Sequence, residues 1–96
     1  MTYKLDFLTE ALKEWKALDP TIKNQLKKKL GKRLENPIIP AARLSGSRNR
    51  YKIKLRAIGY RLVYEVINDE IVIIVIAVGK REQSSVYKKA ARRVVP

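Results

Sequence analysis

The sequence contains neither cysteine nor histidine. Without cysteine the chain forms no disulfide and offers no thiolate to a metal ion. Without histidine it lacks the usual acid–base group at neutral pH and the commonest metal ligand. Any catalysis must therefore use lysine, arginine, tyrosine or carboxylate side chains, and we expect no metal and no cofactor.

Acidic residues are scarce as well. Nine Asp and Glu stand against 22 Lys and Arg, which gives a net charge of +13 and a pI near 10.3. Solubility of a small domain is served by a net charge of only about 2–8 in magnitude. The excess favours a polyanionic partner, with nucleic acid first, an anionic membrane surface second and an acidic protein third.

Long apolar segments and low-complexity stretches are also missing. The apolar run from Ile71 to Val78 is far shorter than the roughly 20 residues that span a bilayer. The first residues include Lys4 and Asp6, which does not fit a signal peptide. Gly and Pro number only four each in 96 residues, of which 46% are hydrophobic. We expect one domain over residues 1–96, soluble and cytoplasmic, with no membrane partner.

The first third of the chain predicts a strand and two helices. Residues 1–7 alternate between apolar and polar side chains, as in a half-buried strand. Thr9 is a candidate cap for a helix whose apolar side chains are Leu8, Ala11, Leu12, Trp15 and Leu18, with Trp15 expected in the core. Asp19 and Pro20 predict the cap and first residue of a second helix, which ends at Asn36-Pro37. Together these helices would form a hairpin.

After a loop over residues 36–49, the sequence predicts three strands, at 51–55, 60–67 and 71–78. Gly59 and Asn68-Asp69 mark the turns, and Gly79 is expected to end the third strand. Ser84 or Ser85 would cap a last helix that runs to about Val94. The fold class is therefore α+β: a helical hairpin packed on one face of a small, mostly antiparallel four-strand sheet, with a C-terminal helix.

Basic side chains gather on the predicted sheet. Lys52, Lys54 and Arg56 alternate along one strand and so share a face, and Arg61 returns to that face after the turn at Gly59. Arg81 follows the last strand. One interpretation is that this row only keeps one face of the sheet solvated. With Glu65 as the one obvious acidic neighbour, however, the row carries little balancing charge.

These side chains suit cleavage of RNA through its 2′-hydroxyl, which needs a base, a cation at the phosphate and an acid at the leaving oxygen. Arginine binds phosphate oxygens with a fork of donors. Lysine is a poor base at its usual pKa of about 10.4, but a crowd of like charges lowers that pKa. Tyr87 on the last helix would hydrogen-bond near the phosphate or stack on a base, or else would only pack on the sheet.

Further basic residues flank this face. They either form solvated surfaces or dock onto structured RNA through its phosphates. In the second helix they are Lys27, Lys28, Lys29, Lys32 and Arg33; around the loop, Arg43, Arg48 and Arg50; near the last helix, Lys80, Lys88, Lys89, Arg92 and Arg93.

Three stretches of sequence resemble the RelE family of toxin–antitoxin toxins. They are "LDFLTEALKEWKAL", "YKIKLRAIGYRLVYEV" and "VIAVGKREQSSVYKKA". The resemblance implies a RelE-like microbial RNase fold and a metal-independent endoribonuclease that cuts mRNA in the ribosomal A site. It also implies five catalytic residues: Lys52 and Lys54 as the base region, Arg61 at the transition state, Arg81 near the leaving oxygen, and Tyr87. Ser45 departs from the family, which often has a basic residue there; Arg43 or Arg48 would have to replace it.

The resemblance also implies partners. They are the ribosome, through its rRNA and A-site mRNA, and a RelB-like antitoxin that wraps the toxin and can displace its last helix. Operator DNA would be reached only through the antitoxin. Two alternatives stay open: a gyrase-poisoning ParE-like toxin, which generally lacks these five residues, and a non-catalytic module that binds nucleic acid through its basic side chains.

Overall fold

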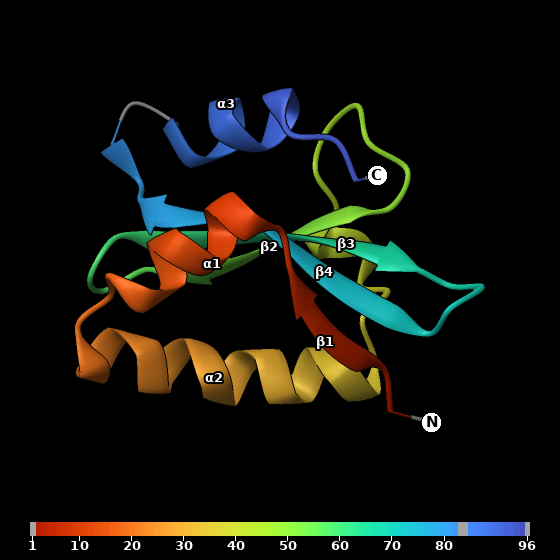
Figure 1. Cartoon of the computed structure of the whole chain (residues 1–96), viewed down its shortest axis with the longest axis horizontal. Helices are drawn as coiled ribbons and strands as arrows, with labels where there is room; N and C mark the ends of the chain where they lie inside the picture. Colours follow the sequence, from red (N-terminus) through yellow and green to blue (C-terminus); the bar gives the residue numbers. More distant parts are fainter. Residues whose placement is uncertain (1, 83–84, 96) are drawn as a thin grey trace.

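The computed structural model describes residues 2–82 and 85–95 (Figure 1). Within these residues the helices and strands follow the predicted order. They are β1 (Lys4–Phe7), α1 (Thr9–Lys16), α2 (Pro20–Glu35), a 3-10 turn η1 (Pro40–Ala42), β2 (Arg50–Leu55), β3 (Tyr60–Ile67), β4 (Val72–Lys80) and α3 (Ser85–Arg92).

The strands form one mixed sheet in the order β1-β4-β3-β2. The β2–β3 and β3–β4 pairs are antiparallel, and β1 lies parallel to β4. Strand β4 is therefore central, and Ile73, Val75, Ile76 and Ala77 along it are fully buried. This confirms the predicted mostly antiparallel four-strand sheet, in which β1 is an edge strand.

The sheet separates two layers of helix (Figure 1). On one face, Leu26 and Leu30 of α2 and Trp15 of α1 pack in the larger core cluster with side chains of β2 and β3. On the other face, α3 packs through Val86 and Ala90 against Val63, Ile76 and Ala77. The alternation of β2 follows from this arrangement, because the sheet face toward α2 buries Tyr51, Ile53 and Leu55. Lys52 and Lys54 consequently lie on the face that carries α3.

Most of the predicted boundaries are confirmed, and α2 begins after Asp19 as expected. Thr9 is not a cap, because Leu8 occupies the N-cap position and Thr9 is the first residue of α1. The last helix ends at Arg92 rather than near Val94, with Ser85 as its first residue. The other predicted cap, Ser84, lies outside the described residues.

Gly79 does not end its strand, so that prediction is wrong. It pairs with Arg61 inside β4, which continues to Lys80. A Cβ at Gly79 would lie 3.3 Å from Cγ2 of Val86. The missing side chain thus permits close packing of α3 on the sheet rather than a break in the strand.

No helix in residues 2–82 and 85–95 is both long and apolar enough to cross a membrane.

Candidate active site

The candidate site is built on the β2–β3 hairpin. Lys54 pairs with Arg61 across the two antiparallel strands, and Arg61 pairs in turn with Gly79 of β4. Residues directly opposite in an antiparallel pair project from the same face, with Cβ atoms about 4.5–5.5 Å apart. The register therefore places Lys54 and Arg61 side by side, and Lys52, two residues earlier, lies on the same face.

Arg81 reaches the same end of the sheet from β4. Its backbone N–H donates to the carbonyl of Gly59, at 2.6 Å, immediately before β3 begins. Gly59 adopts a φ of +68°, which glycine tolerates without strain, so the chain can reverse tightly here. The turn after β2 thereby brings Arg61 and Arg81 to one edge of the molecule. We call Lys52, Lys54, Arg56, Arg61 and Arg81 the cationic cluster.

The charges of this cluster act on Lys54. The neighbouring ammonium of Lys52, partial desolvation and the charges of Arg56, Arg61 and Arg81 lower the pKa of Lys54 from its usual 10.5. Like charges destabilise the protonated form, so the neutral amine becomes more abundant near neutral pH. The sequence pattern predicts this direction, and the structure provides the neighbours that cause it.

Arg61 is buried, with only 5% of its surface exposed. Its Nη1 donates to the backbone carbonyl of Tyr60 at 2.8 Å. No ion pair within the described residues includes Arg61. A buried guanidinium with five donors and no carboxylate partner there is an unbalanced charge, and an anion such as a phosphate would balance it.

Tyr87 lies half-buried on α3, packed against the smaller core cluster. It borders an open pocket of about 780 Å³ together with Lys52 and the loop from Leu44 to Asn49. Ser45 and Arg48 line the same pocket. The structure thus places Tyr87 on the same open pocket as Lys52, which belongs to the cationic cluster, and this pocket has room for a nucleotide.

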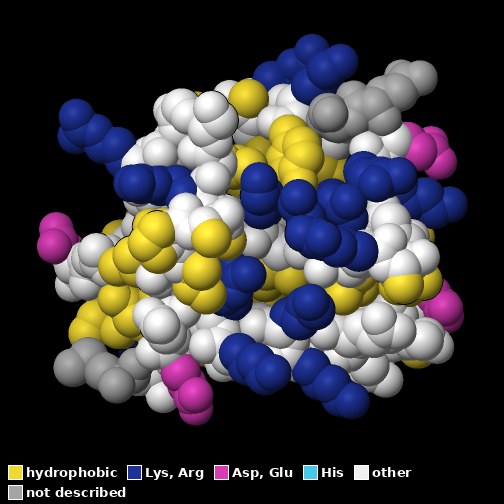
Figure 2. Space-filling view, turned by 180° about the vertical axis from the view of Figure 1, so that it is seen from behind, with side chains coloured by type: hydrophobic (Ala, Val, Ile, Leu, Met, Phe, Trp, Pro, Cys, Tyr) yellow, Lys and Arg dark blue, Asp and Glu magenta, His cyan; other side chains and the backbone are white. Residues whose placement is uncertain are grey.

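The cationic cluster continues onto α2. Lys52, Lys54 and Arg56 border a second open pocket, of about 300 Å³, with Lys29 and Arg33 of that helix. Figure 2 shows Lys and Arg side chains gathered in the middle of the face seen from behind, with Asp and Glu only toward its margins. Of the other basic residues predicted to contact RNA, the following are exposed: Lys27, Lys28, Lys29, Lys32, Arg43, Arg48, Arg56, Lys80, Lys88 and Lys89.

Two predicted RNA-contacting arginines are instead used inside the protein. Arg33 donates from Nη1 to the carbonyl of Lys52 at 3.1 Å and to the hydroxyl of Tyr64 at 2.9 Å. Arg50 forms an ion pair with Glu65, Nε to Oε1, at 2.8 Å. Lys89, although exposed, lies 3.3 Å from the Glu14 carboxylate. Arg33 thus joins α2 to the sheet, the Arg50–Glu65 pair joins β2 to β3, and Lys89 joins α3 to α1. These contacts reduce the positive charge that is free to bind RNA.

The sequence of the chain is similar to those of known toxins. A family model described as the ParE toxin of the type II toxin–antitoxin system parDE matches residues 5–85. Over 95 residues the chain is 55% identical to the mRNA interferase toxin RelE of Escherichia coli (strain K12), covering 99% of this chain and 100% of that protein. The chain belongs to the RelE family.

Solved RelE structures share its fold. A mutant of E. coli RelE in the free state matches with a TM-score of 0.90 at 54% identity, covering 99% of this chain and 100% of that one. The toxin in the intact E. coli RelBE toxin–antitoxin complex matches with a TM-score of 0.81 at 56% identity, over 84% of this chain and 99% of that one. The fold class and the family resemblance are thereby confirmed.

Proposed function

We propose that this RelE-family protein is the toxin of a type II toxin–antitoxin pair. It cleaves mRNA in the ribosomal A site and so inhibits translation in the cytoplasm. The observation that carries the proposal is the register of β2 and β3, which sets Lys54 beside the buried and unbalanced Arg61. The 55% identity to a protein named an mRNA interferase supports it.

In this mechanism, the 2′-oxygen of one nucleotide attacks the adjacent phosphorus. Lys54, in the field of Lys52, takes the 2′-hydroxyl proton, and Arg61 binds the charge that grows on the phosphate oxygens. The new O2′–P bond forms as the P–O5′ bond breaks. The departing 5′-oxygen, beside Arg81, takes a proton from water, and Lys54 returns its proton to the solvent. The products are a 2′,3′-cyclic phosphate and a 5′-hydroxyl.

Tyr87 completes the site by stacking on a base or hydrogen-bonding near the phosphate. The ribosome aligns the 2′-oxygen with the phosphorus, which is worth several orders of magnitude in rate. Free RNA, which is not held in line, is therefore cut poorly. The exposed lysines of α2 contact rRNA phosphates without reading sequence.

The antitoxin partner is a RelB-like protein, as in the RelBE complex whose toxin this chain matches. An acidic or amphipathic antitoxin segment complements the net charge of +13. Operator DNA is contacted through the antitoxin.

The proposal is tested by incubating the chain with ribosomes programmed with a defined mRNA and mapping the cleaved ends. We expect cleavage within the A-site codon, and loss of activity in Arg81→Ala. A parallel incubation with DNA gyrase looks for trapped double-strand breaks. Such breaks without mRNA cleavage would overturn the proposal in favour of a gyrase poison. Binding of the ribosome without cleavage of its mRNA would favour a non-catalytic module instead.

The lowered pKa of Lys54 leads to a pH prediction. The cleavage rate should rise with pH, because only the neutral amine of Lys54 acts as a base. Since the pKa of Lys54 is lowered from 10.5, the rate should level off at a pH below 10.5. Lys52 is the largest cause of the lowering, so Lys52→Met should raise the pKa of Lys54 and move the profile to higher pH. Each rise of one in that pKa reduces the neutral fraction about tenfold at pH 7.

The measurement is single-turnover cleavage on programmed ribosomes between pH 6 and 9. Lys16→Met, which removes an exposed lysine at the end of α1, is the matched control and should keep the wild-type profile. Rates for Lys52→Met equal to those of the wild type at every pH in this range would contradict the proposed role of Lys52.

A further inference from the structure

Helix α3 carries Tyr87 but has few apolar contacts of its own. It is eight residues long, and only Val86 and Ala90 are buried in it. Helices shorter than about 12–15 residues are marginal in water without tertiary contacts. The position of Tyr87 therefore depends on whatever fixes α3 to the sheet.

Arg50 fixes the C-terminal end of α3. Its Nη1 donates to the carbonyl of Ala90, and its Nη2 donates to the carbonyl of Arg93 at 2.6 Å. Carbonyl groups at a helix C-terminus lack partners within the helix and carry the negative end of its dipole, so a cation there is doubly favourable. Arg50 thus supplies from β2 the hydrogen bonds that the end of α3 needs.

Glu65 holds the Arg50 side chain in this orientation. The two residues are directly opposite in the β2–β3 register, and Nε of Arg50 lies 2.8 Å from Oε1 of Glu65. Their side chains are only 15% and 13% exposed. A pair so shielded from water and salt is stronger than an ion pair on an open surface. The Arg50 guanidinium consequently donates from Nε to the sheet, and from Nη1 and Nη2 to the end of the helix.

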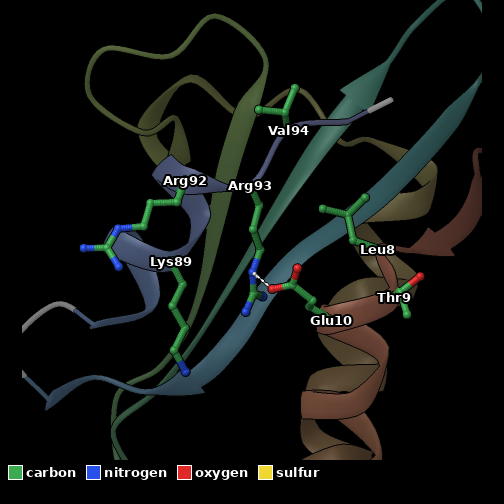
Figure 3. A pocket seen from close by; sticks show the side chains of 7 residues that line it. All are labelled: Leu8, Thr9, Glu10, Lys89, Arg92, Arg93 and Val94. Atoms are coloured by element: carbon green, nitrogen blue, oxygen red, sulfur yellow. Dashed lines mark ion pairs between the residues drawn. The ribbon is translucent and has the colours of Figure 1, made fainter.

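A second set of contacts joins the same end of α3 to α1 and β4. Arg93 donates from Nη1 and Nη2 to the two carboxylate oxygens of Glu14, at 2.8 and 3.0 Å, and from Nη1 to the carbonyl of Ile76 at 2.9 Å. Figure 3 shows the Arg93 side chain running from the helix end toward α1, where it also pairs with Glu10. Burial alone would raise the pKa of Glu14, but the hydrogen bonds from Arg93, the Val78 amide and Lys89 hold it below its usual value.

Tyr87 is three residues before Ala90 on the same short helix and borders the same pocket as Arg50 and Lys52. We propose that Arg50, oriented by Glu65, is a positioning residue that holds α3 on the sheet and thereby keeps Tyr87 at the pocket that Lys52 also lines. This inference rests on the proposed function, because it concerns the use of Tyr87 in RNA cleavage.

The first test is amide hydrogen exchange of the full chain. Arg50→Ala should reduce the protection of the amides of residues 89–93 at least tenfold, while the amides of β3 and β4 keep theirs. Lys16→Ala removes the same charge at a residue outside the site. It should leave the protection of residues 89–93 and that of β3 and β4 unchanged. Arg50→Lys, which keeps a charge and donors, should restore part of the protection. Unchanged protection of residues 89–93 in Arg50→Ala would overturn the proposal.

The second test is a double-mutant cycle in single-turnover cleavage on programmed ribosomes. If Arg50 acts through Tyr87, Arg50→Ala should slow cleavage about tenfold in the wild type and hardly at all in Tyr87→Ala, with ribosome affinity unchanged in both. Equal losses in the two backgrounds would overturn the positioning role and indicate a general loss of stability. Should Arg50→Ala fail to fold, Glu65→Gln keeps the shape of its partner and is expected to give the same pattern with smaller losses.

The two tests separate this inference from the proposed function. A wild-type chain that does not cut mRNA would end the proposed function, and the exchange measurement would still report on Arg50. Cleavage by the wild type with unchanged protection in Arg50→Ala would end the inference alone.

Discussion

Arg61→Met is expected to slow mRNA cleavage on programmed ribosomes by about 100- to 1,000-fold, the usual effect of removing one donor from a transition-state charge. Methionine fills much of the same volume but offers no hydrogen bonds or charge to the phosphate. Ribosome affinity should change little, because the exposed lysines of α2 remain. Single-turnover rates and a ribosome co-sedimentation assay measure the two quantities separately.

The same variant should also unfold less readily. Arg61 is 5% exposed and has no carboxylate partner within the described residues, so its charge destabilises the folded state. Replacing it with an apolar side chain should raise the free energy of unfolding by about 1 kcal/mol, as removal of a functional but strained group often does. Urea titration tests this. A wild-type rate in Arg61→Met would contradict the catalytic role, and a large fall in stability would show that the guanidinium serves the fold.

Lys54→Ala is expected to reduce cleavage by about 100- to 10,000-fold, the range for loss of a general base. Stability should hardly change, because the Lys54 ammonium is not buried and the fold does not depend on it. The rate is measured in the same single-turnover assay, with Lys16→Ala as the control of equal charge.

Lys54→Arg separates the two roles that a lysine can have here. Arginine keeps the positive charge but does not lose its proton near neutral pH, so it cannot act as a base. We expect Lys54→Arg to be nearly as slow as Lys54→Ala. A rate close to that of the wild type would show that Lys54 stabilises the phosphate charge and that another group removes the 2′-hydroxyl proton.

Much of the site follows from local patterns in the sequence. The alternation of Lys52 and Lys54 with Tyr51, Ile53 and Leu55 fixes their face, and the glycine at position 59 sets the turn that brings Arg61 opposite Lys54. Once the hairpin register is known, Arg81 must lie near Gly59, because β4 is the next antiparallel strand. Period-two patterning and a tight turn are short-range properties, which is why the sequence predicts them.

Short-range patterns do not predict contacts between segments that are far apart in the sequence. Arg50 and Arg33 look like further RNA-binding arginines in the sequence, but they meet Glu65, Ala90 and Tyr64 only after the sheet and helices have packed. Glu14 and Arg93 are 79 residues apart. The Arg50–Glu65 pair is nearer to a local pattern, since the two residues lie opposite each other in the β2–β3 register, but Arg50 lies outside the predicted strand at 51–55.

The role of Gly79 also depends on tertiary packing that a local sequence pattern does not predict. A glycine after an apolar run usually marks the end of a strand, yet this one is kept inside β4 by pairing with Arg61 and by the approach of Val86. The packing of α3 decides its role, and the position of α3 is a tertiary property. Sequence patterns therefore predict the cationic cluster better than the helix that completes the site.

The most direct measurement replaces a single nucleotide of the A-site codon with its 2′-deoxy form, so that the attacking hydroxyl is absent. In the proposed mechanism the cationic cluster catalyses attack by that hydroxyl, so cleavage at the altered bond should disappear while the ribosome binds the protein as before. The unaltered mRNA should yield a 2′,3′-cyclic phosphate at the same position. Cleavage of the 2′-deoxy bond at an undiminished rate would contradict the mechanism, because the nucleophile would then be something other than the RNA itself.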